Sequence, residues 1–143
     1  MTPEQARYYL TSYAEKWIGT FYSWGGNDPA GFDCSGYICE LLQGVGLIGR
    51  SEDLSASALW DRFKEHKTQI AYEGCLAFWI DESGQKIIHV EYCISDSLTL
   101  GASGGGSRTL TREDAIRDNA FIKMRPIRKE HLKGFIDPIK SMG

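Results

Sequence analysis

The chain has 143 residues and a mass of 16.0 kDa, which is enough for one domain with a hydrophobic core. Hydrophobic residues make up 42% of it and charged residues 24%, an ordinary balance for a globular protein. The net charge of −3 provides no basic field to attract nucleic acid. We therefore expect a single domain over residues 1–143 and no nucleic-acid partner.

The N-terminus, MTPEQARYYL, carries charges where a secretory signal needs an apolar core. No apolar run approaches the length that spans a bilayer, so we expect no membrane partner and synthesis in the cytoplasm without a signal peptide. The four cysteines are then expected to be reduced. There is no CxxC pair and there are only three histidines, so neither a metal site nor another cofactor is expected.

The first predicted element is a helix over residues 3–18. Thr2 and Pro3 form a good N-cap and first-turn pair, apolar residues follow at helical spacing, and Gly19 offers the stop. The stretch FYSWGGNDPAGF, residues 21–32, is rich in Gly, Asn, Asp and Pro, and it predicts a loop.

A second helix is predicted from Cys34 to Gln43, ending at Gly44, and a shorter one over residues 56–65 with Ser55 as its cap. The pattern then changes to β-branched and aromatic runs with period two, which predict strands over 76–80, 86–94, 97–102 and 121–127, with a short helix over 111–119 before the last. Helices followed by an antiparallel meander indicate the α+β class.

The segment FDCSG, residues 32–36, places a cysteine behind an aspartate at the start of the second helix. Asp33 is a natural N-cap, so Cys34 falls on the first turn, where free N–H groups and the helix dipole favour the thiolate that attacks carbonyls. The same N–H groups could stabilise an oxyanion, and Gly36 would let a substrate backbone approach. The alternative is that Cys34 is a small buried core residue.

One of the three histidines stands out as a candidate base. His66 and His131 lie in the charged stretches DRFKEH and RKEHLK, which favours solvated surface positions. His89 lies inside the strand IIHVEY, and strand alternation places it on the same face as Glu91. A polar pair within an apolar strand indicates a cleft, although a strand histidine can also be only a hydrogen-bonded structural residue.

Four segments in this order, YSWGG (22–26), FDCSG (32–36), LAFW (76–79) and HVEY (89–92), resemble the NlpC/p60 family of cysteine peptidases. The resemblance covers about residues 5 to 102. It implies a papain-like α+β core in which the cysteine helix packs on an antiparallel sheet. It also implies hydrolysis of amide bonds in peptidoglycan stem peptides, typically between D-γ-glutamate and a diamino acid.

The resemblance further implies site residues. Cys34 would be the nucleophile and His89 the base. Tyr22 would point its hydroxyl toward the cleft, and Trp24 would form a cleft wall or else pack beneath the loop. The residues expected to meet the substrate are Tyr22, Trp24, Asp33, Ser35 and Gly36.

The sequence departs from the family pattern at three places, positions 75, 91 and 101. Cys75 stands where the family has an aspartate, and we expect it to be a packing residue. Gly101 stands where the family has a histidine that orients the base, whereas Glu91 stands where the family has glycine. A carboxylate on the face of His89 could fix its tautomer, so Glu91 is the predicted third catalytic residue. The open alternatives for this role are Asp96, Ser103 and a backbone carbonyl, and Glu91 could instead bind substrate amines or face water.

The leading prediction is a bacteriophage endolysin or tail-associated hydrolase that acts on the bacterial cell wall after lysis, or after delivery by phage or secretion machinery. Two other settings stay open, an interbacterial amidase toxin and a cytosolic enzyme that trims muropeptides. A non-enzymatic phage structural module and an acyltransferase on the same fold are the alternatives from other classes.

Overall fold

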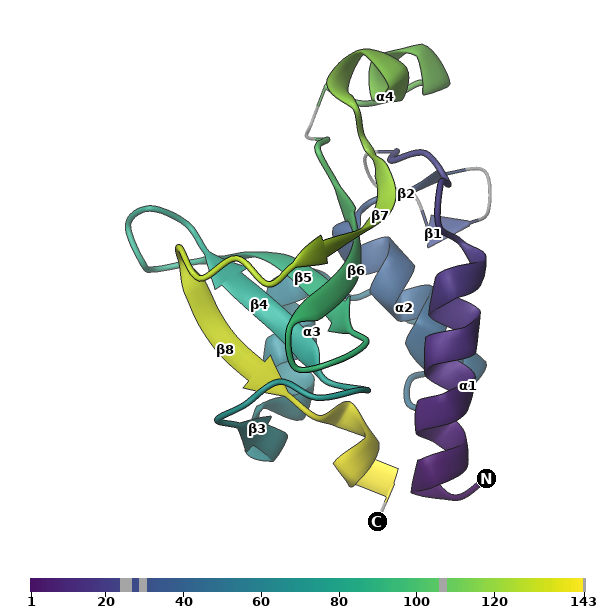
Figure 1. The fold of residues 1–143 in the computed structure, drawn as a ribbon, viewed down its shortest axis with the longest axis vertical. Helices are drawn as coiled ribbons and strands as arrows, with labels where there is room; N and C mark the ends of the chain where they lie inside the picture. Colours follow the sequence, from purple (N-terminus) through teal and green to yellow (C-terminus); the bar gives the residue numbers. More distant parts are fainter. Residues whose placement is uncertain (24–26, 29–30, 106–107, 143) are drawn as a thin grey trace.

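The computed structural model describes residues 1–23, 27–28, 31–105 and 108–142. Helices α1 and α2 stand beside a sheet, α3 lies behind it, and α4 projects from one end of the molecule (Figure 1). The helices are α1 (Pro3–Lys16), α2 (Cys34–Gly44), α3 (Ala56–Phe63) and α4 (Arg112–Asp118), with 3-10 turns η1 (Lys64–His66) and η2 (Pro138–Met142). None of the helices in the described ranges is both long enough and apolar enough to cross a membrane.

The sheet has six strands in the order β3-β8-β4-β5-β6-β7, and every neighbouring pair is antiparallel. Its strands are β3 (Lys67–Thr68), β4 (Leu76–Ile80), β5 (Ile87–Cys93), β6 (Leu98–Ser103), β7 (Phe121–Pro126) and β8 (Leu132–Ile136). Strands β4 to β7 form a meander in chain order, and β8 returns to pair with β4. The predicted α+β class is confirmed.

The helix starts follow the predicted capping chemistry. The Thr2 hydroxyl accepts a hydrogen bond from the backbone N–H of Gln5, and the Gln5 side chain accepts one from the backbone N–H of Thr2, so α1 begins with a complete capping box. Ser55 caps α3 in the same manner, through the N–H of Ala58. The end of α1 differs, because the helix closes at Lys16, two residues earlier than predicted.

The sequence prediction missed three pieces of sheet. Strand β8 lies in the interior of the sheet, although its lysine and glycine interrupt the apolar pattern that marks a strand. Gly134 adopts φ +152° there, beside a register shift in the pairing with β4. The short β3 was also missed. So was a pair of antiparallel two-residue strands within the predicted loop, β1 (Asn27–Asp28) and β2 (Gly31–Phe32).

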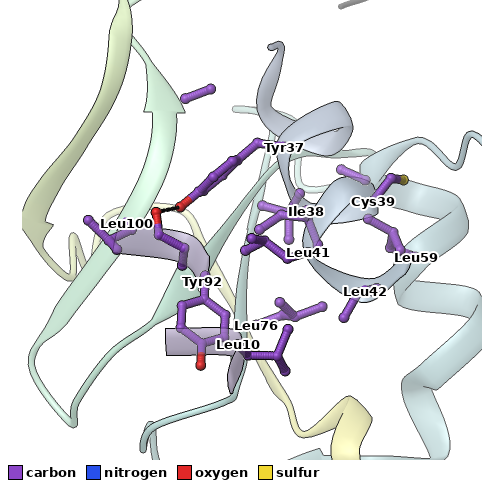
Figure 2. Packing of buried hydrophobic residues seen from close by; sticks show 14 of the residues in the cluster. Leu10, Tyr37, Ile38, Cys39, Leu41, Leu42, Leu59, Leu76, Tyr92 and Leu100 are labelled. Carbon is purple, nitrogen blue, oxygen red and sulfur yellow. Dashed lines mark hydrogen bonds between the residues drawn. The ribbon is translucent and has the colours of Figure 1, made fainter. Parts of the chain in front are cut away.

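The core lies between α2 and the inner face of the sheet (Figure 2). Tyr37 is fully buried, and its hydroxyl donates to the carbonyl of Ala14 on α1 at 2.6 Å, which ties the two helices together. The labelled neighbours of Tyr37 in this cluster are Leu10, Ile38, Cys39, Leu41, Leu42, Leu59, Leu76, Tyr92 and Leu100. Because α2 is anchored by this packing, the position of its N-terminus is fixed relative to the strands.

Three of the four cysteines are buried. Cys39 lies in the main core with its sulfur against the backbone of Leu54, and burial raises its thiol pKa to about 11. Cys75 and Cys93 belong to a second apolar cluster, and burial raises the pKa of both thiols. Cys75 is therefore a packing residue, as predicted, and Cys34 is the more accessible thiol.

Candidate active site

A groove with a volume of about 1160 Å³ runs between the N-terminus of α2 and one end of the sheet. Cys34, Tyr22, Asp33 and Ser35 line it on the helix side, and His89 lines it from β5. The remaining lining residues come from the start of α3, the ends of β4 to β6, and the segment from Arg125 to His131. A space of this size accommodates a short peptide segment.

The helix side of the groove is built by the cap of α2. The Asp33 carboxylate accepts a hydrogen bond from the N–H of Gly36 at 2.6 Å, and its carbonyl accepts from Tyr37 at 3.1 Å. Cys34 is then the first helical residue and is partly exposed, as expected for a thiol that must meet a substrate. Gly36 does not fulfil its prediction, because it is buried and outside the groove lining, and its N–H is engaged by the cap.

Tyr22 lies beside the cysteine. It is only 5% exposed, and its backbone N–H donates to the carbonyl of Ala120 at 3.0 Å, which holds it at the edge of β7. Its ring lies against Gly105, where a Cβ would come within 2.4 Å of a ring carbon. Burial, and then the neighbouring Cys34 and Asp33, raise the pKa of Tyr22, so its hydroxyl stays a neutral donor. Trp24, the predicted cleft wall, lies outside the described residues.

His89 is held between Cys34 and Glu91. Its Nε2 atom is 2.7 Å from Oε2 of Glu91, and its ring lies 5.5 Å from the ring of Trp79 on β4. Burial lowers the pKa of His89, but side-chain hydrogen bonds with Cys34 and Glu91, together with the charges of both, raise it to about 9. Since a carboxylate can only accept, Nε2 carries the proton toward Glu91, and Nδ1 is left for the thiol.

Glu91 is 1% exposed and is held on both carboxylate oxygens. Thr99 on β6 donates its hydroxyl to Oε1 at 2.6 Å, and Arg125 on β7 donates to Oε2 at 2.7 Å. Arg128 approaches Oε2 more loosely, at 3.4 Å. Burial raises the pKa of Glu91, but the hydrogen bond and charge of His89, then Thr99 and the charge of Arg125, lower it to about 2. The carboxylate is thus charged at neutral pH.

The glycine at position 101 explains how a carboxylate reaches this place from β5. A Cβ at Gly101 would lie 2.4 Å from Cγ of Glu91 and 2.8 Å from its Cδ, closer than real Cβ atoms come. The departures from the family pattern at positions 91 and 101 are therefore complementary, because Glu91 occupies the space that a side chain at position 101 would need. Among the alternatives, Ser103 has a buried hydroxyl with no hydrogen-bond partner within the described part of the chain, and Asp96 is not among the residues lining the groove.

Several residues of the site carry no signal in the sequence. Thr99, Arg125 and Arg128 meet at Glu91 only because β5, β6 and β7 are adjacent in the sheet. His131, predicted on the solvated surface, is exposed and also lines the groove. His66 is not among the lining residues.

Comparisons with known proteins bear on the family and the fold of the chain. A model of the NlpC/P60 family matches residues 19–125, more than half of the chain. The chain is 32% identical over 97 residues to the probable endopeptidase p60 of Listeria monocytogenes, covering 68% of this chain and 19% of that protein. It is 40% identical over 55 residues to the probable peptidoglycan endopeptidase LytE of Bacillus subtilis, covering 38% of this chain and 16% of that protein. The chain thus spans less than a fifth of the length of either relative.

Solved structures share the fold. The peptidoglycan hydrolase RipB from Mycobacterium tuberculosis superposes with a TM-score of 0.67 at 25% identity, covering 96% of this chain and 66% of that one. The NlpC/p60 domain of the peptidoglycan hydrolase SagA gives a TM-score of 0.63 at 23% identity, covering 91% and 97%. The second likeness concerns the fold alone.

Proposed function

The chain belongs to the NlpC/P60 family, and we propose that it is a cysteine peptidase that hydrolyses amide bonds in peptidoglycan stem peptides. The observation that carries the proposal is the row of Cys34, His89 and Glu91 along an open groove, in which Nε2 of His89 lies 2.7 Å from Glu91 and Cys34 helps to raise the pKa of His89. The names of the relatives, endopeptidases and peptidoglycan hydrolases, support the substrate class. The bond between D-γ-glutamate and a diamino acid is the specific target that we propose.

In the first half of the reaction, His89 holds the proton of the thiol and Cys34 attacks as thiolate. A C–S bond forms to the amide carbon while the carbonyl electrons move onto oxygen. The backbone N–H of Cys34, on the first helical turn, and the neutral hydroxyl of Tyr22 are the donors available to that oxygen. The C–N bond then breaks, and the amine leaves with the proton from the His89 imidazolium.

In the second half, the neutral His89 takes a proton from water, which attacks the thioester. The C–S bond breaks, the new carboxylic acid departs, and the thiolate is restored beside the imidazolium. Glu91 keeps Nε2 protonated throughout, so that the same nitrogen, Nδ1, faces the thiol in both halves. Its burial and its contacts with Thr99 and Arg125 suit this fixed role.

The biological setting is a separate proposal. A phage lysin or tail-associated hydrolase, synthesised in the cytoplasm and delivered to the wall, was the expectation from the sequence. The curated relatives named above are bacterial proteins and lend the phage setting no support, so it stays a prediction. Lysis of host cells by the protein added from outside, compared with lysis by the protein expressed inside, would test the delivery that it requires.

The test of the reaction is digestion of purified peptidoglycan followed by mass spectrometry of the released muropeptides. We expect new D-γ-glutamyl carboxylates and new free amines on the diamino acid with the wild-type protein, and neither with Cys34→Ala. Cys39→Ala is the matched control, since it removes a cysteine five residues further along the same helix whose sulfur faces the core. Cleavage at another amide would change the assigned bond. Undiminished cleavage by Cys34→Ala would remove the nucleophile and the proposal with it.

A second measurement separates an enzyme from a non-enzymatic module on the same fold. A limiting amount of iodoacetamide should modify Cys34 selectively, because the other three thiols are buried. The modified protein should lose cleavage in proportion to the labelled fraction. A protein whose thiols react slowly and alike, and which releases no muropeptide, would be the non-enzymatic module.

A further inference from the structure

Basic side chains gather on the wall of the groove that carries His89. Lys86 precedes β5, Arg125 is the last residue but one of β7, and Arg128 and Lys129 follow β7. Glu130 is the acidic residue of this wall among those that line the described groove, and Asp33 lies on the opposite, α2 side. The chain as a whole has a net charge of −3, so this concentration of positive charge is local.

Arg128 is held in place from two directions. Its guanidinium lies over the ring of Trp79, 4.9 Å from the centroid, and its backbone carbonyl accepts a hydrogen bond from Trp79 Nε1 at 2.9 Å. Its contact with Glu91 is long, 3.4 Å, and its side chain is 45% exposed. A stacked, partly exposed guanidinium in a groove is well suited to a planar carboxylate, which it can bind through two N–H groups.

The one buried acid beside this wall does not neutralise it. Glu91 contacts His89, Arg125 and Arg128, so that one carboxylate is shared by two guanidinium groups and the His89 ring, which also neighbours Cys34. The Nε atom of Arg125 is buried and has no hydrogen-bond partner within the described part of the chain. A second anion near these groups would therefore gain charge-assisted hydrogen bonds.

The position of His89 tells which part of a substrate meets this wall. In the proposed reaction the histidine gives its proton to the departing amine, so groups beside His89 and beyond it face the residue that contributes this amine. We propose that the basic wall binds a free carboxylate on the amine-side residue of the cleaved bond, with Arg128 and Lys129 as its main contacts. This inference rests on the proposed function, and it narrows the substrate to stem peptides in which that carboxylate is not amidated.

The test uses two synthetic stem peptides that differ only in the amine-side residue, which carries a carboxylate in one and a primary carboxamide in the other. We expect kcat/KM to be about tenfold or more higher for the carboxylate, the size of a charge-assisted hydrogen bond. Rising salt should reduce this ratio, because the groups are partly exposed. We compare the ratio of the two kcat/KM values, because a variant that slows the chemical step for both peptides alike leaves this ratio unchanged.

Arg128→Gln and Lys129→Gln should each bring the ratio toward one. Lys129→Gln guards against an indirect effect, because within the described part of the chain Arg128 forms an ion pair with Glu91 and Lys129 does not. Lys133→Gln is the control and should keep the wild-type ratio, since Lys133 lies over Trp60, outside the groove lining. Equal kcat/KM for both peptides, or an unchanged ratio in both groove variants, overturns the carboxylate site and leaves the proposed function standing. Cleavage of neither peptide by the wild type overturns the proposed function itself.

Discussion

The two sides of the groove are built in different ways. The nucleophile side consists of consecutive residues, Asp33 to Gly36, whose geometry follows from the cap of one helix. The base side is assembled from three strands, and the hydrogen bond from Arg125 to Glu91 joins residues 34 positions apart. One side depends on local capping and the other on strand register.

This difference has a functional consequence. A cap forms wherever its helix forms, so the nucleophile side tolerates changes elsewhere in the fold. The carboxylate of Glu91 needs a donor on β6, a donor on β7 and an empty position at Gly101, all at once. Substitutions with no contact to a substrate should therefore impair the base side, whereas comparable changes on the helix side should be mild.

Removing the base should have the largest effect of the variants on the strand side. His89→Ala takes away the group that exchanges the proton with thiol and leaving amine, and should lower kcat by about a thousandfold. His66→Ala is the control, because His66 lies in η1 and outside the groove lining. Single-turnover cleavage of a stem peptide measures both. A large loss in His66→Ala, with His89→Ala active, would mean that the base has been misassigned.

Removing the charge of Glu91 should cause the second-largest loss of turnover. Glu91→Gln keeps the size of the side chain but withdraws the anion that raises the pKa of His89, so turnover should fall by about a hundredfold. The sign of the pH effect follows from the direction of the shift. The wild-type imidazolium persists up to about pH 9, so activity should decline above that pH, and in the variant the decline should begin at lower pH.

The profile of kcat/KM against pH, measured alongside the pH dependence of Cys34 alkylation, records this shift. A merely structural role for Glu91 would lower stability without moving either profile. Coincident profiles and equal turnover in wild type and Glu91→Gln would exclude the carboxylate as the group that orients His89.

The space at position 101 should matter without any direct contact with substrate. Gly101→Ala places a methyl group 2.4 Å from Cγ and 2.8 Å from Cδ of Glu91, so the carboxylate must shift. We expect about a tenfold loss in kcat, with the same shift of the pH profile as in Glu91→Gln but smaller, since the charge remains nearby. Gly49→Ala is the control, because a Cβ there meets only Glu52, at an ordinary 3.5 Å. A Gly101→Ala enzyme with wild-type kcat and pH profile would show that the two positions are not complementary.

The contrast between features set by neighbouring residues and features set by strand register also explains what could be predicted from the sequence. The cap at Asp33, the partly exposed Cys34 and the pairing of His89 with Glu91 all follow from patterns within a few residues, and the structure contains them. The meander strands followed from their apolar period, but β8 did not, because Lys133 and Gly134 break it.

The partners of Glu91 could not be predicted for a different reason. Thr99 and Arg125 face each other across β6 and β7, and this pairing depends on register, which no single strand encodes. The departure at Gly101 was visible in the sequence, but its meaning needed the distance to Glu91.

The smallest expected effect tests the helix side. Asp33→Ala removes the side-chain hydrogen bond to the N–H of Gly36, so it should lower the free energy of unfolding by about 1 kcal/mol. Asp33→Asn retains an acceptor and should recover most of this stability. Thr2→Ala removes the equivalent cap of α1, far from the groove, and should lower the free energy of unfolding by a similar amount while leaving turnover unchanged.

Urea unfolding measures the free energy of unfolding, and iodoacetamide labelling measures the reactivity of the Cys34 thiol separately. If the nucleophile side depends only on the cap of α2, Cys34 is labelled at the wild-type rate in Asp33→Asn and Thr2→Ala. In Asp33→Ala the labelling rate changes by only a fewfold, far less than the loss of kcat in Glu91→Gln. A collapse of labelling in Asp33→Asn would mean that the charge at the cap, rather than its hydrogen bond, sets the state of the nucleophile.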